Sequence, residues 1–85
     1  MMMSLEEVEY TVGGLRGRLK RTDVVRKLEG VPPGPIREHA VEVAGVVFPI
    51  KQAFACAAGI DVLDFTTNQA RRVFKRLGFP VTRVG

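Results

Sequence analysis

The sequence has 85 residues, of which 46% are hydrophobic and 26% charged, a balance typical of one small folded domain rather than a disordered chain. One cysteine, Cys56, and one histidine, His39, exclude an internal disulfide and a zinc site of the usual Cys/His kind. No apolar run approaches the ~20 residues of a membrane span, and the first residues lack the order of a secretion signal. We therefore expect a cytoplasmic protein with no membrane partner.

The net charge of +4 comes from one part of the chain. Residues 1–48 carry equal numbers of basic and acidic side chains, whereas residues 66–85 carry basic side chains and no acidic one. Basic charge gathered in one segment is expected of a surface that binds a polyanion. The same charge also occurs on helices simply for solubility.

Residues 1–30 are predicted to form a helical N-terminal piece. Residues 4–7 read S-L-E-E, a capping-box pattern that predicts a short helix from Leu5 with Val8 and Val12 facing inward. Gly13 and Gly14 weaken or end this helix. We expect the whole piece to share one core with the rest of the chain.

The run L-R-G-R-L-K-R at residues 15–21 brings four cations close together. It fits a helix, a loop or a strand, and the sequence does not decide among them. Thr22 or Asp23 then caps a second short helix that runs through Leu28 and stops at Gly30. After it, residues 31–36 read V-P-P-G-P-I, and their three prolines predict a connector.

Residues 37–85 are predicted to form a ββααβ unit. β-branched residues on both sides of Ala44-Gly45 predict a hairpin over residues 40–48. Pro49 suits the first position of a helix that ends at Gly59, and this helix is apolar nearly all round, as expected in a core. A last strand over residues 79–84 is expected to pair with the hairpin.

The helix over residues 66–77 is the clearest element of the sequence. Thr66 and Gln69 form a capping box, and Gly78 supplies a left-handed stop. One apolar stripe is predicted on it, made by Ala70, Val73, Phe74 and Leu77. Cations lie on the opposite side, at Arg71, Arg72, Lys75 and Arg76. Such a helix buries one face and offers four cations to water.

These elements predict a small single α+β domain with the order α-α-β-β-α-α-β. Two helices joined by a short connector are similar to a helix-turn-helix, and the hairpin with the last strand makes a small antiparallel sheet. The predicted architecture is therefore winged-helix-like.

Few residues suit catalysis or metal binding. With His39 as the single histidine, a histidine metal cluster cannot be assembled from one chain. Asp61 and Asp64 could hold a metal with Glu42 or Glu38, but carboxylates in a connector more often cap turns. The glycines near residue 13 lack the G-K-[ST] ending of a phosphate loop. We expect a protein that is not an enzyme and that needs neither metal nor cofactor.

The chemistry that remains is that of nucleic-acid recognition. Arginine suits guanine edges, asparagine and glutamine suit adenine edges, and lysine and arginine bind phosphates. Lys51 and Gln52 begin a helix, where unpaired N–H groups can hold a phosphate. The candidate contacts are Asn68, Gln69, Arg71, Arg72, Lys75, Arg76, Arg83, Lys51, Gln52, Arg16, Arg18, Lys20 and Arg21.

The C-terminal half resembles a known family. The pattern runs from the hairpin through F-P-I-K-Q-A to D-F-T-T-x-x-A-R-R-x-x-x-R-L-G-F, over residues 41–79. It is similar to the small N-terminal head domain of modification-dependent HNH restriction endonucleases and to related short stand-alone bacterial proteins. The matched positions are Gly45, Phe48, Pro49, Lys51, Phe65, Ala70, Leu77, Gly78 and Phe79. The resemblance implies a DNA-associated module, and because the HNH portion is absent, it implies no cleavage.

Two functions are compatible with these patterns. The first is a non-catalytic protein that binds duplex DNA through the basic helix, more readily than RNA, and that would associate with the nucleoid. The second is a protein-interaction or oligomerising adaptor whose basic face meets an acidic partner. In that case Val46, Val47 or Val84 at an unpaired sheet edge would favour a homodimer.

Overall fold

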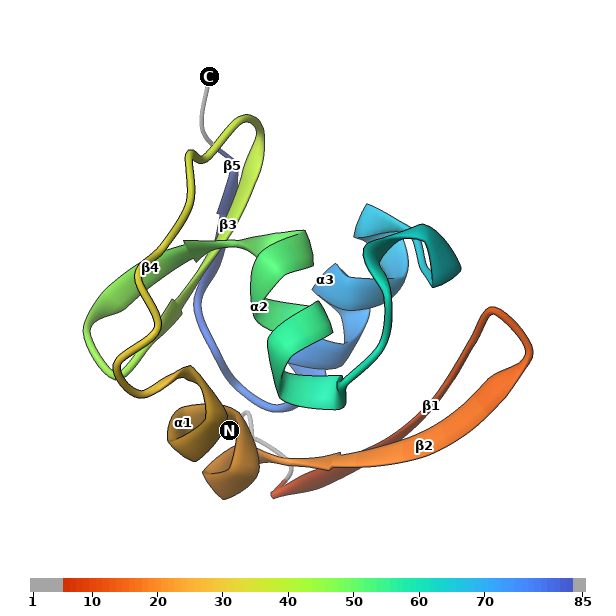
Figure 1. Ribbon diagram of the computed structural model, residues 1–85. Coiled ribbons are helices and arrows are strands. Elements are labelled where there is room, and N and C mark those ends of the chain that lie inside the picture. The colour runs from red at the N-terminus through yellow and green to blue at the C-terminus, as the bar shows by residue number, and fades with distance from the viewer. Residues whose placement is uncertain (1–5, 84–85) are drawn as a thin grey trace.

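The structure, a computed structural model, describes residues 6–83 and begins with an antiparallel hairpin (Figure 1). Strand β1 spans Glu7–Val12 and strand β2 spans Leu15–Lys20. The predicted N-terminal helix is therefore wrong over its described part, while Ser4 and Leu5 lie outside the described residues. Val8, Tyr10 and Val12 alternate with polar residues, so a strand places all three on one face. Gly13 and Gly14 form the turn with φ values of 53° and 77°, which glycine adopts readily.

Helix α1 spans Arg21–Leu28 and follows β2 without a break. Val24 and Leu28 are buried on its inner face. Lys20 is its N-cap and makes no side-chain capping bond, so neither Thr22 nor Asp23 caps it as predicted. Gly30, with a φ of 77°, follows the helix, and the proline connector then runs to the second sheet.

The second sheet has three antiparallel strands in the order β4-β3-β5. β3 spans His39–Val43, β4 spans Val46–Pro49 and β5 spans Val81–Arg83. The predicted hairpin is confirmed, with Ala44 and Gly45 at φ values of 51° and 80° in its turn. The predicted pairing of the last strand is also confirmed, because β5 lies beside β3.

Two longer helices lie between the sheets. Helix α2 spans Ile50–Ala58 and ends at Gly59, whose φ of 70° is left-handed. A short 3-10 turn, η1, spans Val62–Asp64 and is capped by the Asp61 carboxylate, which accepts a hydrogen bond from the Leu63 N–H at 2.9 Å. Helix α3 spans Thr67–Arg76, as the sequence predicted.

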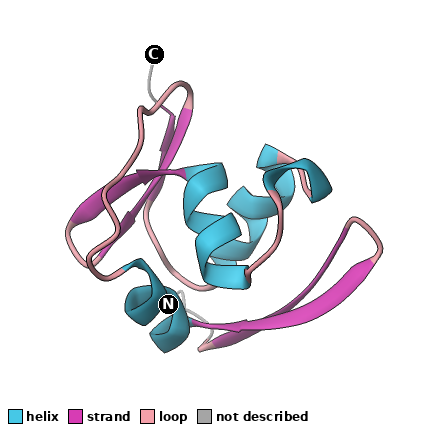
Figure 2. Ribbon diagram, viewed as in Figure 1, coloured by secondary structure: helices cyan, strands magenta, loops and turns pink. Residues whose placement is uncertain are grey.

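Residues 6–83 form a small α+β domain with three α-helices and two antiparallel sheets (Figure 2). Its order is β-β-α-β-β-α-α-β, so the predicted order, which began with two helices, is wrong. Figure 1 shows α2 and α3 between the hairpin on one side and the three-stranded sheet on the other. Among residues 6–83 no helix combines the length and the apolar character that crossing a membrane requires.

Phe54 of α2 lies at the centre of the core and is fully buried. Its ring makes edge-to-face contacts with Tyr10, Phe65 and Phe74, with ring centroids 5.3, 4.7 and 6.0 Å apart. These partners come from β1, the segment before α3, and α3 itself. One hydrophobic cluster therefore joins the N-terminal hairpin to the C-terminal unit.

Candidate nucleic-acid interface

Helix α3 is fixed at its start and along its inner face. The Gln69 N–H donates to the Thr66 hydroxyl at 3.2 Å, and the Thr66 N–H donates to the Gln69 side-chain oxygen at 2.8 Å. This reciprocal capping box satisfies two of the N–H groups that a helix start leaves unpaired. Ala70, Val73 and Phe74 are buried on the inner face. The helix is thus held in one orientation, with its opposite face outward.

Three of the four cations of α3 are exposed: Arg72, Lys75 and Arg76. Arg71 is only half-buried rather than exposed, which corrects the prediction that all four face water. Its Nη1 donates to the Asn68 side-chain oxygen at 3.2 Å, and its Nε is buried. Arg71 and Asn68 therefore hold each other beside the exposed face, which reduces what either offers to a ligand.

The exposed cations of α3 have no carboxylate within ion-pair distance among residues 6–83. Other arginines of the chain are paired. Arg26 Nη2 lies 3.7 Å from the Asp23 carboxylate, and Arg83 Nη2 lies 3.4 Å from the Glu38 carboxylate. The exposed positive charge of α3 is therefore not compensated by ion pairs within the described residues.

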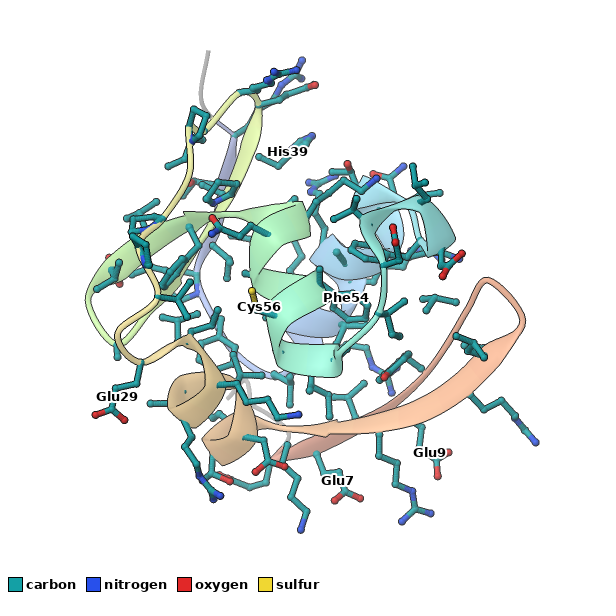
Figure 3. The ribbon with its side chains drawn as sticks, in the orientation of Figure 1. Glu7, Glu9, Glu29, His39, Phe54 and Cys56 are labelled. Carbon is teal, nitrogen blue, oxygen red and sulfur yellow. The ribbon has the colours of Figure 1, made fainter. Side chains whose placement is uncertain are left out.

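The N-terminal hairpin carries a second set of cations on its outer face. Arg16, Arg18 and Lys20 alternate along β2 and stand opposite Thr11, Glu9 and Glu7 of β1. Figure 3 shows Glu7 and Glu9 on the side of the hairpin that faces away from α2. Arg18 Nη2 lies 3.0 Å from the Glu9 carboxylate, and Arg18 Nη1 lies 3.6 Å from that of Glu7.

Arg18 is consequently neutralised, and the expectation that it binds phosphate is not favoured by its contacts. Arg16 stands opposite the uncharged Thr11, and neither Arg16 nor Lys20 has an ion-pair partner in the described part of the chain. The hairpin therefore contributes Arg16 and Lys20, rather than all of its cations, to the positive surface.

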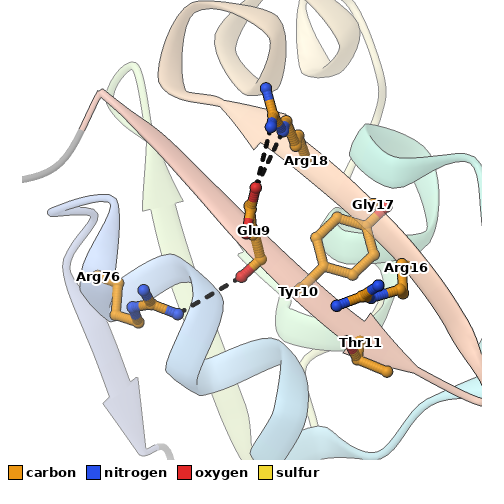
Figure 4. Close-up of a pocket in the computed structure, with 7 residues that line it drawn as sticks. All are labelled: Glu9, Tyr10, Thr11, Arg16, Gly17, Arg18 and Arg76. Atoms are coloured by element: carbon orange, nitrogen blue, oxygen red, sulfur yellow. Dashed lines mark hydrogen bonds and ion pairs between the residues drawn. The ribbon is translucent and has the colours of Figure 1, made fainter.

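A shallow cleft of ≈ 620 Å³ brings the two elements together (Figure 4). It is lined by residues of β1 and β2 and by Arg76, which reaches over from α3. The Arg76 Nη1 donates to the backbone oxygen of Glu9 at 3.5 Å, a long contact that leaves most of the guanidinium donors unused. Arg16 and Arg76, 60 positions apart in the sequence, thus line one cleft. We call Arg16, Arg72, Lys75 and Arg76 the basic patch.

The strand pair below this cleft is fixed by Tyr10 and Gly17. A Cβ atom at Gly17 would lie 2.5 Å from the Tyr10 ring, so only glycine leaves room for the ring at this position. The same ring packs against Phe54. Burial raises the pKa of the Tyr10 hydroxyl above its usual value, so the group stays neutral and adds no negative charge beside the arginines.

Several predicted contacts have structural partners instead. The Gln52 side chain accepts from the Gly34 N–H at 2.8 Å and donates to the Pro32 oxygen at 3.1 Å, so it holds the connector. Gln69 is occupied by the capping box. Arg21 lies over the Phe79 ring, 5.3 Å from its centroid. These three side chains make contacts within the protein that stabilise the fold, so they are less available to bind a ligand.

Lys51 and Arg83 lie away from the basic patch. Lys51 Nζ is 5.3 Å from the centroid of the Phe65 ring and lines a different cleft, together with Arg37. Arg37 was not among the predicted contacts, because it stands alone after the prolines and no local pattern marks it. Among residues 6–83 no three His, Cys, Asp or Glu side chains come together as a metal site would need.

Comparison with curated proteins and with solved structures finds no match. The sequence model of the SCO5918-like family matches residues 15–84. This match begins at the first residue of β2 and takes in α1, the three-stranded sheet, α2 and α3. The chain belongs to the SCO5918-like family.

Proposed function

We propose that the protein is a non-catalytic nucleic-acid-binding protein that contacts the phosphate backbone, of DNA rather than RNA, through its basic patch. One observation carries the proposal: Arg72, Lys75 and Arg76 are exposed on a capped helix and have no carboxylate partner among residues 6–83. Long-range attraction of a polyanion needs such uncompensated charge on a rigid element.

The dimensions of α3 suit this role. Its ten residues give a length of about 15 Å, and the major groove of B-DNA, ~12 Å wide, admits an α-helix. In the proposal, α3 lies along or in the groove as in a winged-helix-like arrangement, and Arg16 and Lys20 of the hairpin contact flanking phosphates. The resemblance of residues 41–79 to endonuclease head domains also supports DNA binding. A protein bound to the bacterial nucleoid would reside in the cytoplasm.

The salt dependence of binding tests this proposal. Contacts to about four to six phosphates predict a slope of about −4 to −5 in a plot of log affinity against log salt. The affinity should then fall by about two to three decades between about 50 and 200 mM salt. Fluorescence anisotropy would be measured on a random-sequence duplex, the same strand alone, and RNA. A slope near zero on all three probes would contradict the proposal. A higher affinity for RNA than for the duplex would show that RNA, rather than DNA, is the preferred ligand.

A second candidate function is supported by the edge of the three-stranded sheet. Val46 and Val47 of edge strand β4 are 42% and 41% exposed, and unpaired strands with apolar side chains promote self-association. An oligomerising adaptor would use this edge and direct the basic patch to an acidic protein. Light scattering with and without duplex separates the two functions, because a stable oligomer that ignores nucleic acid favours the adaptor.

A further inference from the structure

A second cleft, of ≈ 260 Å³, lies where β3, α2 and α3 begin. Its lining includes Arg37 from the connector, His39 from β3, Lys51 from α2 and Thr67 from α3, and is completed by Glu38 and by the apolar Pro35, Pro49 and Ile50. Figure 3 shows His39 extending from β3 on the side where the two helices start. Three segments that are separate in the sequence, residues 35–39, residues 49–51 and Thr67, thus place two cations, an imidazole and a hydroxyl around one small space.

The charge of this cleft is positive. Glu38 is the one carboxylate that lines it, and it is paired with Arg83: its Oε1 lies 3.4 Å from Arg83 Nη2 and 3.7 Å from Nε2 of His39, which lines the same cleft. Arg37 is exposed and has no ion-pair partner among the described residues. Lys51 packs its ammonium over the Phe65 ring and likewise has no carboxylate partner in residues 6–83. Two cations are therefore left for a ligand.

The start of α2 adds to these groups. Pro49, the N-cap, makes no side-chain capping bond, whereas α3 is fully capped by Thr66. Within residues 6–83 no side chain accepts a hydrogen bond from the first-turn N–H groups of α2, and the first two residues of the helix, Ile50 and Lys51, line the cleft. Lysine, arginine, a hydroxyl and unpaired helix N–H groups are together the donors that bind phosphate oxygens.

We propose that this cleft binds the dianionic head of a phosphate monoester. Its volume lies below the ~300–1,000 Å³ of pockets for drug-sized ligands, which suits a phosphate with a small attached group. The phosphate can come from the 5′ end of a nucleic-acid strand or from a small phosphorylated molecule. The inference does not depend on the basic patch, because none of the lining residues belongs to it.

Inorganic phosphate is the first probe, titrated into isotope-labelled protein at constant ionic strength and followed by amide chemical shifts. We expect saturable shifts at His39, Lys51 and Thr67. Arg37→Gln should weaken phosphate binding about tenfold, because it removes a charge-assisted contact. Lys51→Met should weaken it to a similar extent while keeping the stem of the side chain over Phe65.

Lys27→Gln is the matched control, since Lys27 is exposed on α1 and lines neither of the two clefts. Its phosphate affinity should stay within about twofold of the parent. The proposal is overturned if phosphate produces no saturable shift. It is equally overturned if both cleft variants bind like the parent, or if Lys27→Gln weakens binding as much as they do.

Two oligonucleotides of one sequence, with a 5′-phosphate and with a 5′-hydroxyl, identify the source. Tighter binding of the phosphorylated strand, lost in Arg37→Gln, assigns the cleft to strand ends. Equal binding of the two strands, with phosphate still shifting the cleft, assigns it to a small phosphorylated molecule. Arg72→Glu with Lys75→Glu should leave the binding of inorganic phosphate to this cleft unchanged, because neither residue lines it. Failure of this proposal is therefore distinguishable from failure of the proposed function.

Discussion

The double substitution Arg72→Glu with Lys75→Glu is expected to weaken duplex binding by about 100-fold or more. Both side chains are exposed and have no ion-pair partner among residues 6–83, so the change removes two phosphate contacts and places two carboxylates against the DNA. A loss of 100-fold corresponds to about 2.7 kcal/mol of binding free energy. Anisotropy with a labelled duplex at low salt measures it.

The control must separate a local contact from a change in total charge. Arg26→Glu with Lys27→Glu, on α1, lowers the net charge from +4 to zero, as does the first variant. Binding should fall only a few-fold in this control, through the weaker long-range field. Circular dichroism of both variants should match the parent, since the substituted side chains are exposed. If the two variants lose the same amount of duplex affinity, α3 is not part of the DNA-binding surface.

The substitution Phe54→Ala is expected to cost about 3–5 kcal/mol of unfolding free energy. Phe54 is fully buried and joins Tyr10, Phe65 and Phe74, so truncation leaves a cavity between the hairpin and the helices. A domain of 85 residues has a total stability of about 4–13 kcal/mol. The variant should therefore unfold at a much lower urea concentration than the parent, and it should be marginally folded or unfolded if the parent lies at the lower end of that range; urea denaturation followed by circular dichroism would show this.

Leu63→Ala is the matched deletion at the surface. Leu63 lies on η1 and is 89% exposed, so its removal should change the unfolding free energy by no more than about 0.5 kcal/mol. If Phe54→Ala and Leu63→Ala unfold at the same urea concentration, Phe54 does not occupy the centre of the core.

The C-terminal half could be predicted from the sequence because its signals are local. A capping box around Thr66, a left-handed glycine after each of the two longer helices, and Ala44-Gly45 between β-branched residues each fix one boundary. Only the pairing of the strands with one another depends on residues that are distant in the sequence. The hairpin and α3 were therefore found at nearly their observed bounds.

The N-terminal half could not be predicted in the same way. Val8 and Val12 are four positions apart and fit a helical face as well as a strand. Tyr10 and the Gly13-Gly14 pair carried the opposite signal, since alternation with a two-glycine turn is typical of a hairpin. The S-L-E-E pattern before them favoured a helix, and tertiary packing of Tyr10 on Phe54 favours the strand.

For the candidate site, the sequence located the cations but not their neighbours. Arg18 meets Glu7 and Glu9 only because β1 and β2 pair in one register, and Arg83 meets Glu38 only because β5 pairs with β3. Such ion pairs cannot be predicted from the sequence until the pairing and register of the strands are known. The convergence of Arg16 and Arg76 on one cleft depends on the same placement.

The most direct test of the central claim is a map of the protein surface that duplex DNA contacts. An isotope-labelled sample would be titrated with a short duplex, and the amide shifts assigned to elements. The account predicts that the largest changes fall on the outer face of α3 and on β2 near Arg16, with α1 and β4 unaffected. Changes confined to β4, or no saturable change anywhere, would contradict it.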